Sequence, residues 1–180
     1  MAISVVVASS RQNGHTVALV NSLVTFEPAT VTNLSEKQLS YFDYEHGNKQ
    51  DDFLPMISDL IGSELIVFAT PVYWYSMSAQ LKVFIDRLTD LLTIEKEMGR
   101  ALRGKRFAVI ATGTDSELPA CFTEQFQRIG DYLGMEMLPP LYCQCPDGFN
   151  ESQHKVAISN FAELIKGYCY CRYQRFIMRL

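Results

Sequence analysis

Three short runs of the chain are apolar at nearly every position, and this feature limits the fold more than any other. They are Ile3–Ala8, Leu65–Ala69 and Phe107–Ala111. Apolar runs without alternation are typical of β-strands that are covered on both faces. Two less apolar runs, Thr30–Leu34 and Met135–Leu141, complete the predicted strands. We expect the three apolar strands to be central in a single sheet.

Helical patterns lie between these runs, because apolar residues recur there at a spacing of three and four. The predicted helices cover Val17–Val24, Phe53–Ile61 followed by Gly62, Leu81–Leu92, Phe122–Leu133 followed by Gly134, and Ala157–Tyr168. Ser76 and Ser78 are both candidates to cap the helix that starts near Leu81. Strands that alternate with helices predict parallel strands joined by right-handed crossovers, hence a three-layer α/β sandwich.

The length of 180 residues fits one domain, so we expect residues 1–180 to form a single unit. A net charge of −4 has the wrong sign for a protein that binds a phosphate backbone, and nucleic acid is not an expected partner. No apolar run reaches the roughly 20 residues of a membrane span. Five cysteines, an odd number, do not form the disulfide framework of a small secreted domain. We expect a cytoplasmic protein without a membrane span.

In a doubly wound sheet, ligands bind outside the carboxyl ends of the strands, so three loops are candidates. The first contains Ser9, Arg11, Asn13, Gly14, His15 and Thr16, between a buried strand and a helix. A helix start offers free N–H donors, Arg11 offers a planar fork, and Gly14 lets the backbone approach closely, which together favour a phosphate monoester. The alternative is that these residues only cap and turn the chain.

The second loop contains Pro71, Val72, Tyr73, Trp74 and Tyr75. Aromatic side chains at the end of a central strand form a flat wall for a planar ring. They are equally suited to packing against the next helix or a second subunit.

The third loop starts with Thr112 and Gly113. Gly113 permits unusual backbone angles, and the free amides can donate to a ligand carbonyl. Asp115 and Ser116 are candidates to cap the following helix. A phosphate site beside a site for a flat heteroaromatic ring predicts a mononucleotide, and FMN suits the aromatic loop better than AMP.

The motif Ser9-x-Arg11-x-Asn13-Gly14-His15-Thr16 and the run Thr70–Arg87 (TPVYWYSMSAQLKVFIDR) resemble the flavodoxin-like NAD(P)H-dependent FMN reductases. The resemblance covers roughly residues 1–140, with the three loops in the family's order. It implies a flavodoxin-like three-layer α/β/α sandwich whose five-stranded parallel sheet has the order 2-1-3-4-5. It also implies non-covalently bound FMN that NADPH or NADH reduces.

The resemblance further implies roles for single residues and a subunit arrangement. Ser9, Arg11, Asn13, His15 and Thr16 hold the FMN phosphate. Pro71, Val72, Tyr73 and Trp74 border the isoalloxazine, with Thr112 and Gly113 at its pyrimidine edge. The family is commonly dimeric, so a homodimer supported by the Leu81–Leu92 helix is expected.

The predicted activity is hydride transfer from NAD(P)H to FMN, followed by electron transfer to a small acceptor such as a flavin or quinone. The alternative is a flavodoxin-type electron carrier that does not react with NAD(P)H. Neither prediction requires a side-chain acid or base, so no catalytic residue is assigned. The pairs Cys143-x-Cys145 and Cys169-x-Cys171 lack the usual C-x-x-C spacing, so no metal is predicted. The basic, amphipathic tail from Arg172 suits either a membrane surface or a partner subunit.

Overall fold

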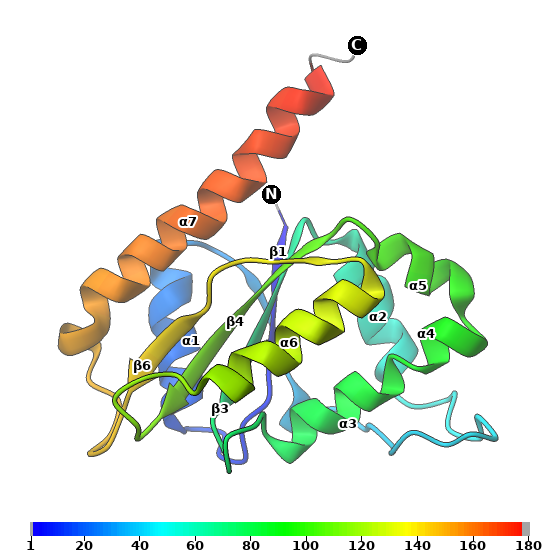
Figure 1. Cartoon of the computed structure of the whole chain (residues 1–180), viewed down its shortest axis with the longest axis horizontal. Helices are drawn as coiled ribbons and strands as arrows, with labels where there is room; N and C mark the ends of the chain where they lie inside the picture. The colour runs from blue at the N-terminus through cyan, green and yellow to red at the C-terminus, as the bar shows by residue number, and fades with distance from the viewer. Residues whose placement is uncertain (1, 178–180) are drawn as a thin grey trace.

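All the described strands lie in one parallel sheet at the centre of the molecule (Figure 1). The computed structural model describes residues 2–177, with side chains as far as residue 168. The strands are β1 (Ile3–Val7), β2 (Thr30–Asn33), β3 (Leu65–Pro71), β4 (Arg106–Gly113), β5 (Glu136–Met137) and β6 (Leu141–Gln144). Their order is β2-β1-β3-β4-β5, and β6 pairs with β4 on the same edge as β5. The predicted order 2-1-3-4-5 is therefore confirmed, with a sixth strand added.

The last predicted strand, Met135–Leu141, is wrong as a single element. The start of β4 pairs with β5, and the end of β4 pairs with β6. Pro139 and Pro140 lie between the two short strands, and proline has no N–H to donate to the ladder. The interruption places β6 beside the carboxyl end of β4, next to the third candidate loop.

Helices cover both faces of the sheet, as the sandwich prediction requires (Figure 1). On one face lie α1 (His15–Phe26) and α7 (Glu151–Ile177), and on the other lie α2 (Phe53–Gly62), α3 (Ala79–Arg87) and α6 (Ala120–Leu133). Shorter helices are η1 (Leu34–Glu36), α4 (Asp90–Thr93) and α5 (Lys96–Leu102). Along β3, Val67 packs in the core under α1 and α7, whereas Ile66 and Phe68 pack in the opposite core. Both faces of the central strands are buried.

The predicted continuous helix Leu81–Leu92 is divided into α3 and α4, which the apolar stripe did not reveal. The amides of Leu88, Thr89 and Leu91 each bond to the carbonyl three residues back, so the backbone tightens between the two helices. Arg87 is fully buried at this break, where it meets Asp90 three residues later. The break therefore coincides with a buried ion pair.

The helix ends follow the predicted signals more closely. Ser78 caps α3 by accepting a hydrogen bond from the Leu81 amide, so it is the cap of the two candidates. Gly134 ends α6 with φ +70°. Helix α7 is longer than its predicted stripe, and Figure 1 shows it running beyond the body of the sheet. None of the described helices combines the length and apolar character of a membrane span.

Candidate functional site

The carboxyl ends of β1, β3 and β4 surround one open cavity of about 370 Å³. This is the edge at which a doubly wound sheet binds its ligands. The residues that line the cavity are Ser9, Arg11, Gly14, His15, Thr16, Pro71, Val72, Tyr73, Thr112, Gly113, Thr114, Cys145 and Pro146. All three predicted loops therefore meet at one place.

The first loop presents unpaired backbone donors at the start of α1. Gly14 is the N-cap residue, and its helix start has no side-chain cap. Among the described residues, the amides of His15 and Thr16 have no acceptor. A Cβ at Gly14 would lie 3.1 Å from Arg11 Cβ and 3.3 Å from Ser9 Oγ, so only glycine fits this tight turn comfortably. Free amides, the helix dipole and the exposed Arg11 together favour an anion.

Thr112 joins the three loops. Its Oγ1 lies 2.8 Å from Thr16 Oγ1 in a buried hydroxyl pair. Its carbonyl accepts a hydrogen bond from the Val72 amide at 2.8 Å. The start of α1 and the β3 loop are therefore both fixed to the end of β4.

The second loop is a tight turn that places aromatic residues in a strained conformation. Tyr73 and Ser76 exchange two backbone hydrogen bonds of 2.9 and 3.0 Å. The central residues, Trp74 and Tyr75, have φ values of +49° and +65°. Glycine or asparagine usually occupies such positions, because a Cβ makes this backbone region unfavourable. The Trp74 side chain is 95% exposed, so the strain is not offset by burial of the indole within this chain.

Contacts from two sides hold this turn in place. Gln125 of α6 accepts a hydrogen bond from Ser76 Oγ at 2.8 Å, and its Nε2 lies 3.5 Å from the Tyr75 carbonyl. After the turn, Ser78 donates from Oγ to the Ala8 carbonyl at 2.8 Å and from its amide to Thr70 Oγ1 at 3.0 Å. The aromatic turn is therefore anchored to α6, β1 and β3.

The third loop differs from its prediction in two details. Gly113 lies in β4 and does not have a positive φ, so backbone freedom is not the reason for glycine here. A Cβ on Gly113 would lie 2.8 Å from Tyr142 Oη, so close packing is the reason. The expectation that Asp115 or Ser116 caps the next helix is also wrong, because α6 starts after Pro119.

These three loops carry the sequence features of a known family. The family model described as NADPH-dependent FMN reductase matches residues 1–150. The chain belongs to this family. It is 30% identical over 147 residues to a putative NAD(P)H-dependent FMN-containing oxidoreductase, YwqN of Bacillus subtilis, covering 75% of this chain and 80% of that protein. The family identifies the chain as an FMN- and nicotinamide-dependent oxidoreductase.

Solved structures of more distant sequence share the fold. The flavoenzyme NAD(P)H:(acceptor) oxidoreductase FerB of Paracoccus denitrificans superimposes with a TM-score of 0.74 at 18% identity, over 94% of this chain and 97% of that one. The Trp repressor binding protein of Bacillus subtilis gives a TM-score of 0.71 at 24% identity, over 90% and 98%. These likenesses establish the flavodoxin-like fold of the reductase.

The residues of the cavity fit FMN. The donors at the start of α1 and the Arg11 guanidinium suit a phosphate, and the cavity continues from them to the ends of β3 and β4. Pro71, Val72 and Tyr73 supply an apolar and aromatic wall there. One cavity therefore combines donors that suit an anion with a wall that suits a planar ring.

Most of the predicted site residues of the reductase lie on the cavity, but three do not. Asn13, Trp74 and Tyr75 are absent from its lining. Thr114, Cys145 and Pro146 line it and were not predicted. Thr114 directly follows a predicted pair and was within reach of sequence reasoning. Cys145 and Pro146 follow β6, and no local sequence pattern predicts that β6 pairs with the end of β4.

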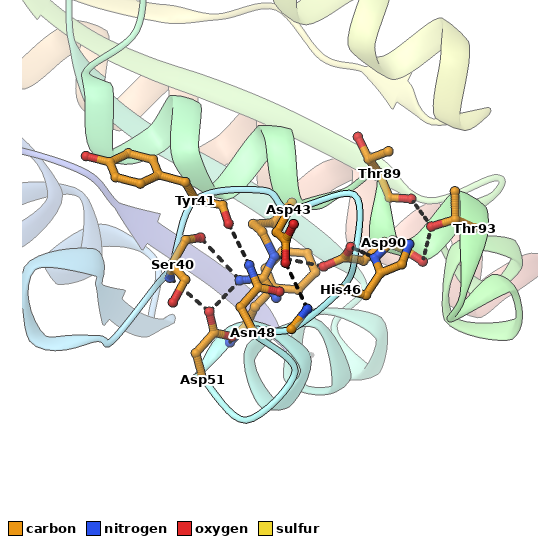
Figure 2. Close-up of polar contacts among 12 residues, drawn as sticks. Ser40, Tyr41, Asp43, His46, Asn48, Asp51, Thr89, Asp90 and Thr93 are labelled. Atoms are coloured by element: carbon orange, nitrogen blue, oxygen red, sulfur yellow. Dashed lines mark hydrogen bonds and ion pairs between the residues drawn. The ribbon is translucent and has the colours of Figure 1, made fainter.

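A separate polar cluster fixes the long loop between η1 and α2 of the reductase (Figure 2). Arg87 donates from Nε to Asp90 at 2.8 Å, and from Nη1 to Asp51 and to the Ser40 carbonyl. Asp90 also meets His46 Nδ1 at 2.9 Å. Burial alone would raise the pKa of the Asp51 carboxyl, but hydrogen bonds from Arg87 and from backbone amides bring it below its usual value. No sequence pattern indicates this cluster, because Asp51 and His46 are far from Arg87 along the chain.

The described cysteines of the reductase are free thiols. Cys143 and Cys145 are buried. Burial, and to a smaller extent the neighbouring Cys145, raises the pKa of the Cys143 thiol to about 12. Burial also raises the pKa of Cys145, so the cavity wall there is neutral at pH 7. The side chains of Cys169 and Cys171, and those of the basic tail from Arg172, lie beyond residue 168 and so outside the described part of the chain. Within the described part of the chain, no three potential ligand side chains gather as a metal site.

Proposed function

We propose that the protein takes a hydride from NAD(P)H and passes the electrons to a small planar acceptor, such as a flavin or quinone. The observation that carries this proposal is a cavity with the uncapped start of α1 at one end and the β3 and β4 loops at the other. Bound FMN supplies the redox chemistry, and the protein supplies binding, orientation and electrostatics.

The chain's own groups divide this work between the loops. Arg11 and the free amides of His15 and Thr16 bind the phosphate, with hydroxyls of Ser9 and Thr16 beside them. Asn13 approaches the phosphate only if its side chain moves, because it does not line the cavity.

The β3 and β4 loops hold the ring. Pro71, Val72 and Tyr73 border one part of it, and Thr112 and Gly113 border its pyrimidine edge. Backbone N–H groups near Gly113 stabilise the negative charge that develops on reduction. No side-chain acid or base is required for hydride transfer, so no catalytic residue is assigned.

Trp74 and Tyr75 support a planar acceptor. Both follow Tyr73 of the cavity wall, and their side chains are 95% and 61% exposed. Aromatic faces stack on other planar rings at a gain of about 0.5–1.5 kcal/mol beyond area burial. The anchored, strained turn holds these faces in place before an acceptor arrives.

Residues 1–180 act, in this proposal, as one FMN-binding domain of a cytoplasmic homodimer. Exposed aromatic side chains support the dimer, because large apolar groups on a surface are typical of an interface. Trp74, Tyr41 and Tyr44 are 95%, 81% and 85% exposed. Light scattering on the purified protein tests it. A monomer at micromolar concentration contradicts the dimer and leaves the proposed chemistry untouched.

The test of the activity is a spectrum followed by an anaerobic titration. The purified protein, saturated with FMN, is mixed with NADH and, separately, with NADPH while the flavin absorbance is followed. Rapid bleaching by either nucleotide is expected, followed by recovery on adding a quinone. Arg11→Ala is expected to need more FMN to reach saturation, and Arg128→Ala is its matched control, because Arg128 is an exposed arginine on α6 that pairs with Glu124.

The same titration separates the alternative. A flavodoxin-type carrier binds FMN but is not bleached by either nucleotide within the time of the experiment. A protein that retains no flavin after unbound FMN has been removed contradicts both functions.

A further inference from the structure

Strand β6 and the residue that follows it donate hydrogen bonds to three successive carbonyl groups, at the end of β4 and in the third loop. The Gly113 carbonyl accepts from the Cys145 amide at 2.7 Å. The Thr114 carbonyl accepts from Gln144 Nε2 at 3.1 Å, and the Asp115 carbonyl accepts from Tyr142 Oη at 2.7 Å. Consecutive carbonyls of an exposed loop are thus all bonded to one short segment of the chain.

These bonds also determine where the amides of the loop point. A peptide unit is planar and trans, so each N–H points opposite to the carbonyl of the residue before it. The N–H groups of residues 114, 115 and 116 therefore point away from their β6 donors. None of these amides has an acceptor among the described residues. Thr114 lines the cavity, so unpaired donors lie at its edge.

Tyr142 has a second contact with this loop. Its hydroxyl occupies the position next to Gly113 that a Cβ would need, 2.8 Å away. The half-buried phenol has a raised pKa, mainly because of burial and secondarily because of Asp115. Its hydroxyl therefore stays protonated and remains a donor at neutral pH.

We infer that Tyr142 and Gln144 are positioning residues, which hold the third loop so that its unpaired amides face the reducible ring of the bound flavin. The effect on flavin binding rests on the proposed function, whereas the contacts of Tyr142 and Gln144 with the loop do not depend on it. Amides aimed at the ring favour the reduced, more negative flavin over the oxidised one. Loss of either side-chain contact therefore weakens the binding of reduced FMN more than that of oxidised FMN.

The first experiment measures the loop without any ligand. Backbone ¹⁵N relaxation of the apo-protein, which gives an order parameter for each amide, compares wild type with Tyr142→Phe and Gln144→Met. Lower order parameters at residues 114–116 are expected, with those at residues 9–16 unchanged. Tyr132→Phe is the matched control, because Tyr132 is 77% exposed on α6 and its hydroxyl has no hydrogen-bond partner among the described residues. Unchanged order parameters in both variants overturn the inference.

The second experiment measures affinity for FMN in both redox states. Tyr142→Phe is expected to lose about three- to tenfold in affinity for oxidised FMN, the scale of one hydrogen bond. Its loss for reduced FMN is expected to be about tenfold larger still, which lowers the two-electron midpoint potential by about 30 mV. Gln144→Met should shift the potential in the same direction.

The outcomes separate the two proposals. Wild-type protein that binds no FMN, combined with lower loop order parameters in Tyr142→Phe, overturns the proposed function while the positioning contact stands. Wild-type protein that binds FMN, with potentials unchanged in both variants, overturns the inference alone. Unfolding curves identify a variant that has lost its fold, and Gln144→Met then provides the result, because it leaves the Tyr142 ring in place.

Discussion

Among the described residues, Arg11 is the one arginine on the cavity wall, where it is exposed beside the free amides of α1. Replacing it with alanine should weaken FMN binding by about 1–3 kcal/mol, the range for a charge-assisted hydrogen bond. Arg11→Lys keeps the charge but loses the planar fork, so it should fall between wild type and alanine. Fluorescence quenching of FMN measures all three, with Arg128→Ala as control. Equal affinity in wild type and Arg11→Ala removes Arg11 from the site.

Position 113 requires glycine because Tyr142 packs closely against it, and not because of its backbone angle. In Gly113→Ala the new Cβ would lie 2.8 Å from Tyr142 Oη, so the phenol must leave the Asp115 carbonyl. We expect a loss of about 1–3 kcal/mol in unfolding free energy, the range for overpacking. Gly62→Ala in α2 is the control, since no atom lies within 4 Å of its added Cβ. Urea unfolding that shows equal stability for both variants would contradict the contact.

At the scale of elements, the buried cluster around Arg87 ties α3 and α4 to the loop before α2. Asp51→Asn removes one charged partner of the fully buried guanidinium and should cost about 3 kcal/mol at pH 7. Asp86→Asn breaks only an exposed pair with Lys82 on the same helix, and should cost at most about 1 kcal/mol. Urea unfolding at pH 7 compares the two. Equal stability of both variants contradicts a stabilising role for the cluster.

The same cluster gives a pH dependence with a definite sign. The pKa of Asp51 is lower in the folded protein than its ordinary value of 3.8. A lowered carboxyl pKa stabilises the fold above the unfolded-state value, and this contribution is lost as the pH falls through the folded-state value. The stability difference between wild type and Asp51→Asn should therefore shrink below about pH 4. A constant difference from pH 7 to pH 3 is the contrary result.

Sequence patterns predicted those elements whose signals are local. The apolar runs of β1, β3 and β4 and the capping residue Ser78 are set by neighbouring residues, and the structure confirms them. The division of Leu81–Leu92 lies at Arg87, whose partner Asp51 is distant along the chain, and it does not appear in the apolar stripe. For the same reason β6 was not predicted as a wall of the cavity, because only pairing with β4 brings Cys145 there.

At the scale of the whole molecule, the site is made of segments from both ends of the matched region, so binding should stabilise the whole fold. FMN at one hundred times its dissociation constant raises the free energy of unfolding by about 2.7 kcal/mol. For a domain of this size that corresponds to a rise in Tm of roughly 5–10 °C. Riboflavin carries the same ring without the phosphate, so at equal concentration it should raise Tm by much less. Equal shifts from both ligands, measured by differential scanning fluorimetry at a wavelength free of flavin emission, would show that the start of α1 does not bind the phosphate.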